Sequence, residues 1–171
     1  MILIIMIIMW MSSSVNVIII DLYIKYIPGG KYINFAISGF AEIFANITAG
    51  VVFTKFGPRI TYATAFIISL GGGVALIFQE DYNNDLLIAF FVLLAKFGAC
   101  MSICCCYVST PWVFPILVCG TAFGICNLFG RFTMAGGSIL AELEIPGPMI
   151  AFTAISGVGL IGSFFLKIRD D

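Results

Sequence analysis

Three charged side chains stand inside long apolar runs of the sequence, where an ion needs a partner. They are Glu42, Lys96 and Arg131. At the centre of a lipid bilayer a lone ionised side chain costs about 2.5–3.5 kcal/mol on insertion scales. We therefore expect all three to face a cavity or one another rather than lipid. Two uses remain open: binding of an ionic ligand, or a structural ion pair in which Glu42 meets Lys96 or Arg131.

Several polar side chains in the same apolar runs are candidates for hydrogen bonds to a ligand. Each of them is equally suited to join two helices, because interhelical hydrogen bonds of about 0.6 kcal/mol are common in membrane proteins. The candidates are Asn16, Tyr23, Asn34, Asn46 and Asn127.

The sequence offers little for catalysis or metal binding. It has no histidine, so a zinc site would need cysteine thiolates alone. Four of the six cysteines cluster, but on a helix the first two share a face and the other two point elsewhere. Cysteine also packs well between helices as a small apolar residue. We expect no metal, no cofactor and no enzymatic activity. The clustered cysteines are Cys100, Cys104, Cys105 and Cys106.

The composition places these residues in a membrane. Hydrophobic residues make up 61% of the 171 residues and charged residues 10%, against roughly 45–50% and about 25% in soluble domains. Eight Lys and Arg against nine Asp and Glu give a net charge of −1. Nucleic-acid binding needs a basic excess that this chain lacks. The composition predicts an integral, multi-pass membrane protein whose first partner is the lipid bilayer.

The apolar runs predict six helical spans, because one crossing takes about 20 residues. The run from Leu86 to Gly130 as a single helix would be roughly 67 Å long, about twice the thickness of the hydrocarbon core. We expect a break at Ser109-Thr110-Pro111 and Pro115. Residues 1–171 then form a single all-α domain with spans at 2–24, 33–54, 60–79, 86–108, 113–137 and 146–167.

An even number of spans places both ends of the chain on one side of the membrane. The positive-inside rule assigns the side with more Lys and Arg to the cytoplasm. Four basic residues share the side of the chain ends and two lie opposite, which favours cytoplasmic termini. They are Lys55, Arg59, Lys167 and Arg169 against Lys25 and Lys31.

Four short motifs carry a resemblance to a known family. They are Phe56-Gly57-Pro58-Arg59, Ala95-Lys96-Phe97-Gly98, the run Tyr107-Val108-Ser109-Thr110-Pro111-Trp112-Val113-Phe114-Pro115, and Gly120-Thr121-Ala122-Phe123-Gly124. Together they resemble the C-terminal six-helix half of the major facilitator superfamily, in particular its organic cation/anion transporter group. The resemblance covers nearly the whole chain, from that family's seventh helix (2–24) to its twelfth (146–167).

The resemblance implies half of a secondary-active or facilitative transporter for small organic solutes. Facilitators hold substrate between two halves, so the chain is incomplete without an N-terminal six-helix half. In the family, a cation at the position of Arg131 accompanies a preference for organic anions. We expect a cavity lined by Arg131, Lys96, Glu42, Asn34 and Asn127. The gating-loop candidates are Lys55, Gly57 and Arg59, and the helix-packing pair is Gly120 and Gly124.

The sequence departs from the family's pattern where the gate is expected. The signature Glu of the family falls on Trp112, its Thr on Ile116 and its Arg on Cys119. These losses favour an alternative: a gate-less, facilitator-like half that serves as a structural or accessory subunit of a larger membrane complex. The expected partners are therefore a second six-helix half or other membrane subunits, together with a small organic ion.

Overall fold

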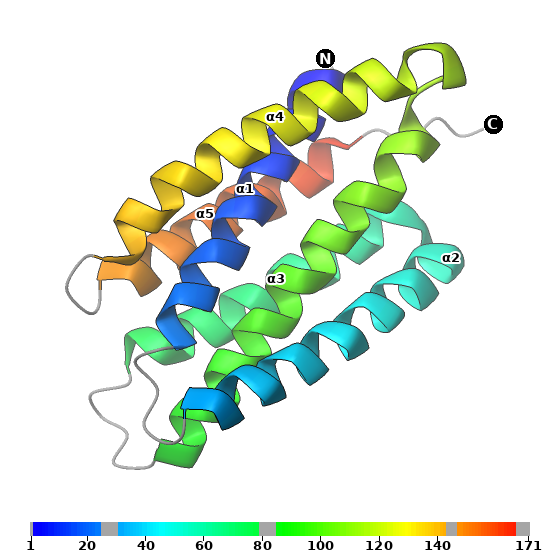
Figure 1. Cartoon of the computed structure of the whole chain (residues 1–171). Helices are drawn as coiled ribbons and strands as arrows, with labels where there is room; N and C mark the ends of the chain where they lie inside the picture. The colour runs from blue at the N-terminus through cyan, green and yellow to red at the C-terminus, as the bar shows by residue number, and fades with distance from the viewer. Residues whose placement is uncertain (1, 25–30, 79–84, 143–146, 167–171) are drawn as a thin grey trace.

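The computed structural model describes residues 2–24, 31–78, 85–142 and 147–166, and they form a bundle of long helices (Figure 1). Each helix is long and apolar enough to cross a membrane. The prediction of an all-α, polytopic membrane protein is confirmed. In chain order the helices are α1 (Ile2–Tyr23), α2 (Lys31–Ile77), α3 (Asp85–Val113), α4 (Ile116–Ala141) and α5 (Gly147–Phe165).

Helix α2 contains a sharp kink that makes it two rods. At the kink Gly57 has φ 78° and ψ 175°, a region of backbone conformation that glycine almost alone adopts. Pro58 follows and cannot donate a backbone hydrogen bond. Residues 31–56, here called the first arm, run to the kink, and residues 58–77, the second arm, return behind them (Figure 1). The two arms occupy the sequences of the predicted spans 33–54 and 60–79.

The break between α3 and α4 falls at the Pro115 end of the predicted segment. We expected it at Ser109-Thr110-Pro111 and Pro115, and α3 continues through Pro111 to Val113. The amide of Phe114 still donates to the Thr110 carbonyl at 3.2 Å, so the missing N–H of proline interrupts the hydrogen bonding only locally. The chain turns at Pro115. This residue has an extended backbone, with ψ 147°, and lies directly before α4.

Glycines set the closest helix contacts. A Cβ atom added to Gly98 of α3 would lie 2.5 Å from the Ser69 amide and 2.7 Å from the Ala65 carbonyl oxygen. The second arm of α2 and α3 therefore pack backbone against backbone. The pair predicted to pack helices, Gly120 and Gly124, makes no such contact within the described chain. A Cβ at either would have no neighbour within 4 Å, because both glycines lie on the exposed side of α4.

Helix α1 packs against α4, α3 and α5, and α2 packs chiefly against α3 and also against α5 (Figure 1). Helix α4 packs chiefly on α1 and scarcely on α3 or α5. Its contact with α1 is close: an added Cβ at Gly130 would meet the Ser14 hydroxyl at 2.8 Å, and one at Gly137 would meet Ile18 at 2.7 Å. This arrangement leaves most of the α4 surface exposed.

Candidate functional site

One lysine and two carboxylates meet where α1, the first arm of α2 and α3 come together. The ammonium of Lys96 donates a hydrogen bond to Oδ1 of Asp21 and lies 3.9 Å from Oε2 of Glu42. The Lys96 side chain is 3% exposed, whereas those of Asp21 and Glu42 are 38% and 53% exposed. Two carboxylates therefore share one buried ammonium, and the group carries a net charge of −1.

Asp21 is the member of this group that the sequence analysis missed. It stands near the end of the predicted span 2–24, where an ionised side chain costs less than at the bilayer centre. The first 20 residues carry no charge, and Asp21 follows them directly at the end of the span. The structure also separates the two pairings that were left open for Glu42: its ion pair is with Lys96.

The third charged candidate, Arg131, lies on α4, away from Lys96. It is exposed, and its Nε donates to Oδ1 of Asn127 one helical turn earlier, at 3.3 Å. In the described part of the chain no ion pair to Arg131 is formed. Its guanidinium is thus available to an anionic group.

Arg131 and Asn127 border a cavity of about 110 Å³ that extends from α4 across α1 to α3. One wall is aromatic. Trp10 and Tyr107 make an edge contact with centroids 4.7 Å apart. A charged rim beside an aromatic wall suits a small organic ion better than an inorganic one. The cavity is lined by Trp10, Ser14, Val17, Ile103, Tyr107, Asn127, Arg131 and Met134.

Trp10 is held in place by a buried hydrogen bond. Its indole N–H donates to the Thr110 hydroxyl at 3.1 Å, and that hydroxyl donates to the Cys106 carbonyl at 2.7 Å. On the second arm of α2, the hydroxyl of Tyr62 pairs with that of Ser109 at 2.7 Å. These bonds join α1, α2 and α3 beneath the aromatic wall and fix its orientation.

The Thr110→Val variant tests the hydrogen bond from the Trp10 indole to the Thr110 hydroxyl. We expect it to lower the free energy of unfolding by about 1 kcal/mol, because it leaves the buried indole N–H of Trp10 without an acceptor. The measurement is denaturant unfolding in detergent, followed by tryptophan fluorescence. Thr121→Val, at an exposed position of α4, is the matched control and is expected to change stability by less than about 0.5 kcal/mol. Equal effects of the two variants would contradict the role given to Thr110.

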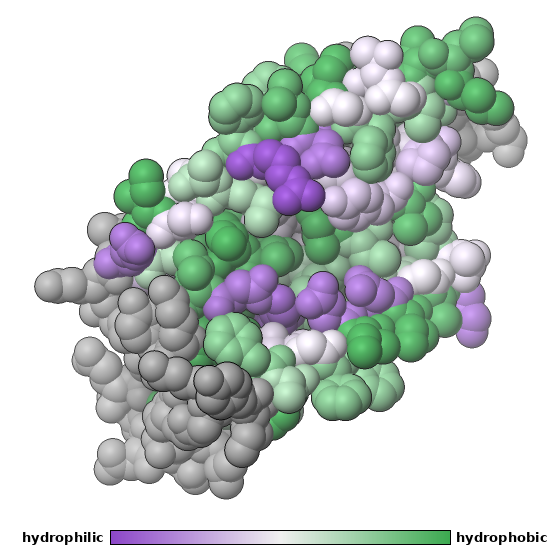
Figure 2. Space-filling model, viewed as in Figure 1, coloured by the Kyte–Doolittle hydropathy of each residue, from purple (hydrophilic) through white to green (hydrophobic). Residues whose placement is uncertain are grey.

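Polar residues gather on the face of the molecule that Figure 2 shows. Figure 2 shows two hydrophilic bands, one over α4 and one over α3 and the first arm of α2, with a paler and apolar strip between them. Arg131 and Asn127 belong to α4, and Glu42 and Asn46 to the first arm. Because charged groups are costly against hydrocarbon, this face, called the polar face below, requires water or protein beside it.

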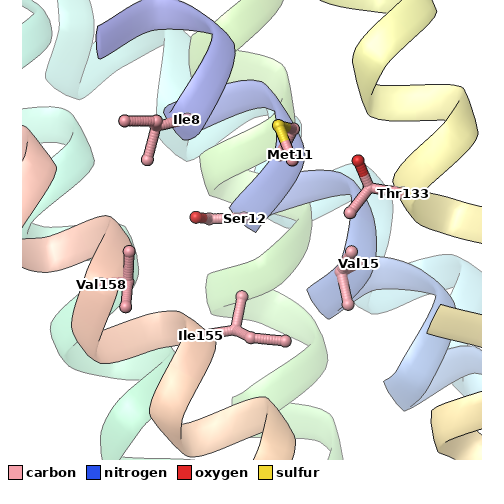
Figure 3. A pocket seen from close by; sticks show the side chains of 7 residues that line it. All are labelled: Ile8, Met11, Ser12, Val15, Thr133, Ile155 and Val158. Carbon is pink, nitrogen blue, oxygen red and sulfur yellow. The ribbon is translucent and has the colours of Figure 1, made fainter. Parts of the chain in front are cut away.

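A second cavity, of about 210 Å³, lies between α1, α4 and α5 (Figure 3). Its lining carries two hydroxyl groups and no charge, so it lacks what an ionic ligand needs. The lining residues are Ile8, Met11, Ser12, Val15, Thr133, Ile155 and Val158.

The predicted gating-loop residues lie at the α2 kink, apart from the charged group. Lys55 is exposed, and Gly57 forms the kink itself. The Arg59 guanidinium lies 5.8 Å from the centre of the Phe164 ring, which attaches the kink to α5. Their gating role stays a prediction.

The remaining polar candidates divide between packing and surface. Asn16 is buried and donates to the Ser156 hydroxyl at 2.8 Å, so it joins α1 to α5 rather than lining the polar face. Tyr23 is buried, and Asn46 is exposed. The side chain of Asn34 lies outside the described residues. So do Lys25, Lys167 and Arg169 and the side chain of Lys31, which were used to predict orientation.

No protein-family model matches the chain, but curated proteins are similar to it, among them the following two. Solute carrier family 22 member 4 of Mus musculus is 34% identical over 136 residues, which cover 78% of this chain and 23% of that protein. Organic cation/carnitine transporter 2 of Homo sapiens is 28% identical over 137 residues, which cover 79% of this chain and 23% of that protein. The chain is thus similar to a solute carrier and to an organic cation/carnitine transporter. It spans about a quarter of the length of these relatives.

This similarity supports the predicted resemblance to membrane transport proteins. It does not support the predicted preference for organic anions, because the human relative is an organic cation/carnitine transporter by name. The structure adds Asp21 to the charged group, which is therefore net negative.

Proposed function

We propose that this chain is the C-terminal six-helix half of a transporter for small organic ions. The observation that carries the proposal is the polar face on a chain that is otherwise built for lipid. Glu42 and Arg131 lie exposed on that face, where hydrocarbon cannot solvate them. Facilitators place their substrate at such a face, between two helical halves, and the similarity to known transporters supports the same use here.

A second, N-terminal six-helix half would cover the polar face and complete the site. The two helices that carry the polar face also have exposed large apolar side chains, among them Phe40 and Phe44 of the first arm and Phe132 of α4, each at least 64% exposed. Apolar surface on these helices suits contact with lipid or with another set of membrane helices. Since the chain spans about a quarter of its relatives, the second half comes from a longer product or from a second chain.

The charges on the polar face favour a substrate that carries a positive group. The Asp21, Glu42 and Lys96 group has one negative charge in excess, and the half-exposed Glu42 can receive an ammonium. Across the face, Arg131 and Asn127 can receive a carboxylate. This pattern supports an organic cation or a molecule that has both charges, as the name of the human relative suggests.

For orientation we propose that both chain ends face the cytoplasm. Helix α1 begins and α5 ends at the same end of the bundle as the α2 kink (Figure 1). Lys55 and Arg59 flank that kink, so the described basic residues support this side as the cytoplasmic one.

Transport assays with three probes test the proposed function. The protein, produced at the length its own gene encodes, is placed in liposomes with any partner that purifies with it. The probes are carnitine, which has a quaternary ammonium and a carboxylate, tetraethylammonium, which has only the positive charge, and benzoate, which has only the negative charge. We expect uptake of carnitine and tetraethylammonium over benzoate. Absence of uptake of all three would overturn the proposal.

The Arg131→Ala variant tests whether Arg131 binds the carboxylate of the substrate rather than its positive group. Removing the guanidinium is expected to raise the KM for carnitine about tenfold, equal to about 1.4 kcal/mol, because the carboxylate loses its partner. Uptake of tetraethylammonium is expected to stay unchanged, which makes the second probe an internal control. An equal loss of both would show that Arg131 acts on folding or on another step.

The alternative function is an accessory subunit without transport of its own. One observation favours it: the positions where the family has gate residues present apolar surface. Trp112 is 55% exposed and Ile116 is 95% exposed, which suits contact with a partner better than a charged gate. The mass of the native complex decides between the two. A stoichiometric assembly that takes up none of the three probes would favour the accessory subunit.

A further inference from the structure

We propose that Asp21 sets the charge preference of the polar face by holding Lys96 away from Glu42. The inference rests on the proposed function, because it concerns which organic ion that site accepts. It assigns to Asp21 a positioning role: the carboxylate acts on the substrate through Lys96 rather than by touching it.

The distances within the group carry this inference. The Lys96 ammonium is hydrogen-bonded to Asp21, but it lies 3.9 Å from Glu42, beyond the range of a normal hydrogen bond. Asp21 is on α1 and Glu42 on the first arm of α2, so the two acids approach the ammonium from different helices. Asp21 is the stronger partner, and Glu42 keeps much of its negative charge.

The exposures point the same way. Lys96 is 3% exposed, and its ammonium has to be paired because an unpaired buried charge is very costly. Glu42 is 53% exposed and stands on the polar face, where a ligand can reach it. Asp21 thus pairs with the Lys96 ammonium, and the Glu42 carboxylate is left to bind the positive group of a ligand.

Without the Asp21 charge, Lys96 would need its second neighbour. The lysine side chain is a flexible four-carbon stem with a compact charge, so its ammonium can close the 3.9 Å gap to Glu42. The two would then form a neutral pair, and the face would retain Arg131 as its main charge. Its preference would move from cations toward anions.

The test measures binding of tetraethylammonium and benzoate to the protein as its gene encodes it, with its native partners, in lipid nanodiscs. We expect Asp21→Asn to weaken tetraethylammonium binding about tenfold and to strengthen benzoate binding. Asp21→Glu, which keeps the charge, is expected to bind both probes as the wild type does. Unchanged affinities in Asp21→Asn would overturn the inference.

The double variant Asp21→Asn with Lys96→Gln separates positioning from direct contact. With no ammonium left to neutralise Glu42, tetraethylammonium binding is expected to return to within about threefold of the wild type, a large departure from additivity that marks two coupled residues. If the double variant binds as weakly as Asp21→Asn, Asp21 contacts the cation itself and the inference is wrong.

A separate readout follows Lys96 without any ligand. A water-soluble amine-acylating reagent, with peptide mass spectrometry, reports how accessible the ammonium is. Acylation of Lys96 is expected to rise in Asp21→Asn, because the ammonium moves toward the half-exposed Glu42. It is not expected to rise in Asp21→Glu, and unchanged acylation in Asp21→Asn would contradict the movement.

The proposed function and the role of Asp21 fail in different ways. Failure of the wild type to transport would overturn the proposed function alone, whereas failure of the wild type to bind tetraethylammonium would overturn the proposed function and the role of Asp21 together.

Discussion

The Lys96→Ala variant is expected to lose about 3 kcal/mol of unfolding free energy, because removing one partner of a buried ion pair strands the charge of the other. Here one ammonium serves Asp21 and Glu42 at the junction of three helices. Both acids are partly exposed, which places the expected loss at the lower end of the range for fully buried pairs. Denaturant unfolding in detergent micelles measures the loss.

Two further variants make that result specific. Lys96→Arg keeps the positive charge and is expected to recover most of the lost stability. Lys55→Ala removes an exposed lysine at the α2 kink and is expected to change stability by less than about 0.5 kcal/mol. If Lys96→Ala unfolds like Lys55→Ala, the ammonium does not hold the three helices together.

The Gly98→Ala variant is expected to destabilise the bundle by about 3 kcal/mol, since crowding a packed contact costs this much when nothing can move. The added methyl group would lie 2.5 Å from the Ser69 amide and 2.7 Å from the Ala65 carbonyl oxygen. Both are backbone atoms of the second arm of α2, so no side-chain rotation can make room. Relief requires α3 and that arm to separate.

Gly124→Ala provides the matched control. A Cβ at Gly124 has no neighbour within 4 Å in the described structure, and alanine favours a helix over glycine by about 1 kcal/mol. We therefore expect Gly124→Ala to be neutral or stabilising in the isolated chain. The same unfolding assay measures both variants, and a Gly98→Ala protein as stable as Gly124→Ala would refute the backbone contact between α2 and α3.

The sequence predicted the fold class because it depends on a simple property. Hydrocarbon-length apolar runs in a chain with 10% charged residues leave few alternatives to membrane helices. Of the two prolines predicted to break the chain after α3, Pro115 does so, whereas Pro111 lies inside the helix. A helix tolerates one lost amide when the following hydrogen bond forms, as Phe114 to Thr110 does here.

The packing glycines show a different limit. Gly120 and Gly124 have the spacing of a packing motif, whereas Gly98 makes the actual close contact. Spacing shows which residues share a helix face but not which helix, if any, lies opposite that face. The same limit applies to the site. The sequence indicated Lys96 and Glu42 as buried charges, but which acid holds the ammonium depends on the crossing of α1 and α3, which a single sequence does not reveal.

The uneven attachment of α4 has a consequence for the size of an acceptable ligand. Lys96 is on α3, which is fastened backbone to backbone to the second arm of α2, whereas Arg131 rides on a helix that rests chiefly against α1. A small tilt of α4 about that single support would change the separation between the guanidinium and the two carboxylates. The carboxylates would keep their place on the rigid side of the bundle, and the position of Arg131 would set the length of ligand that fits between them.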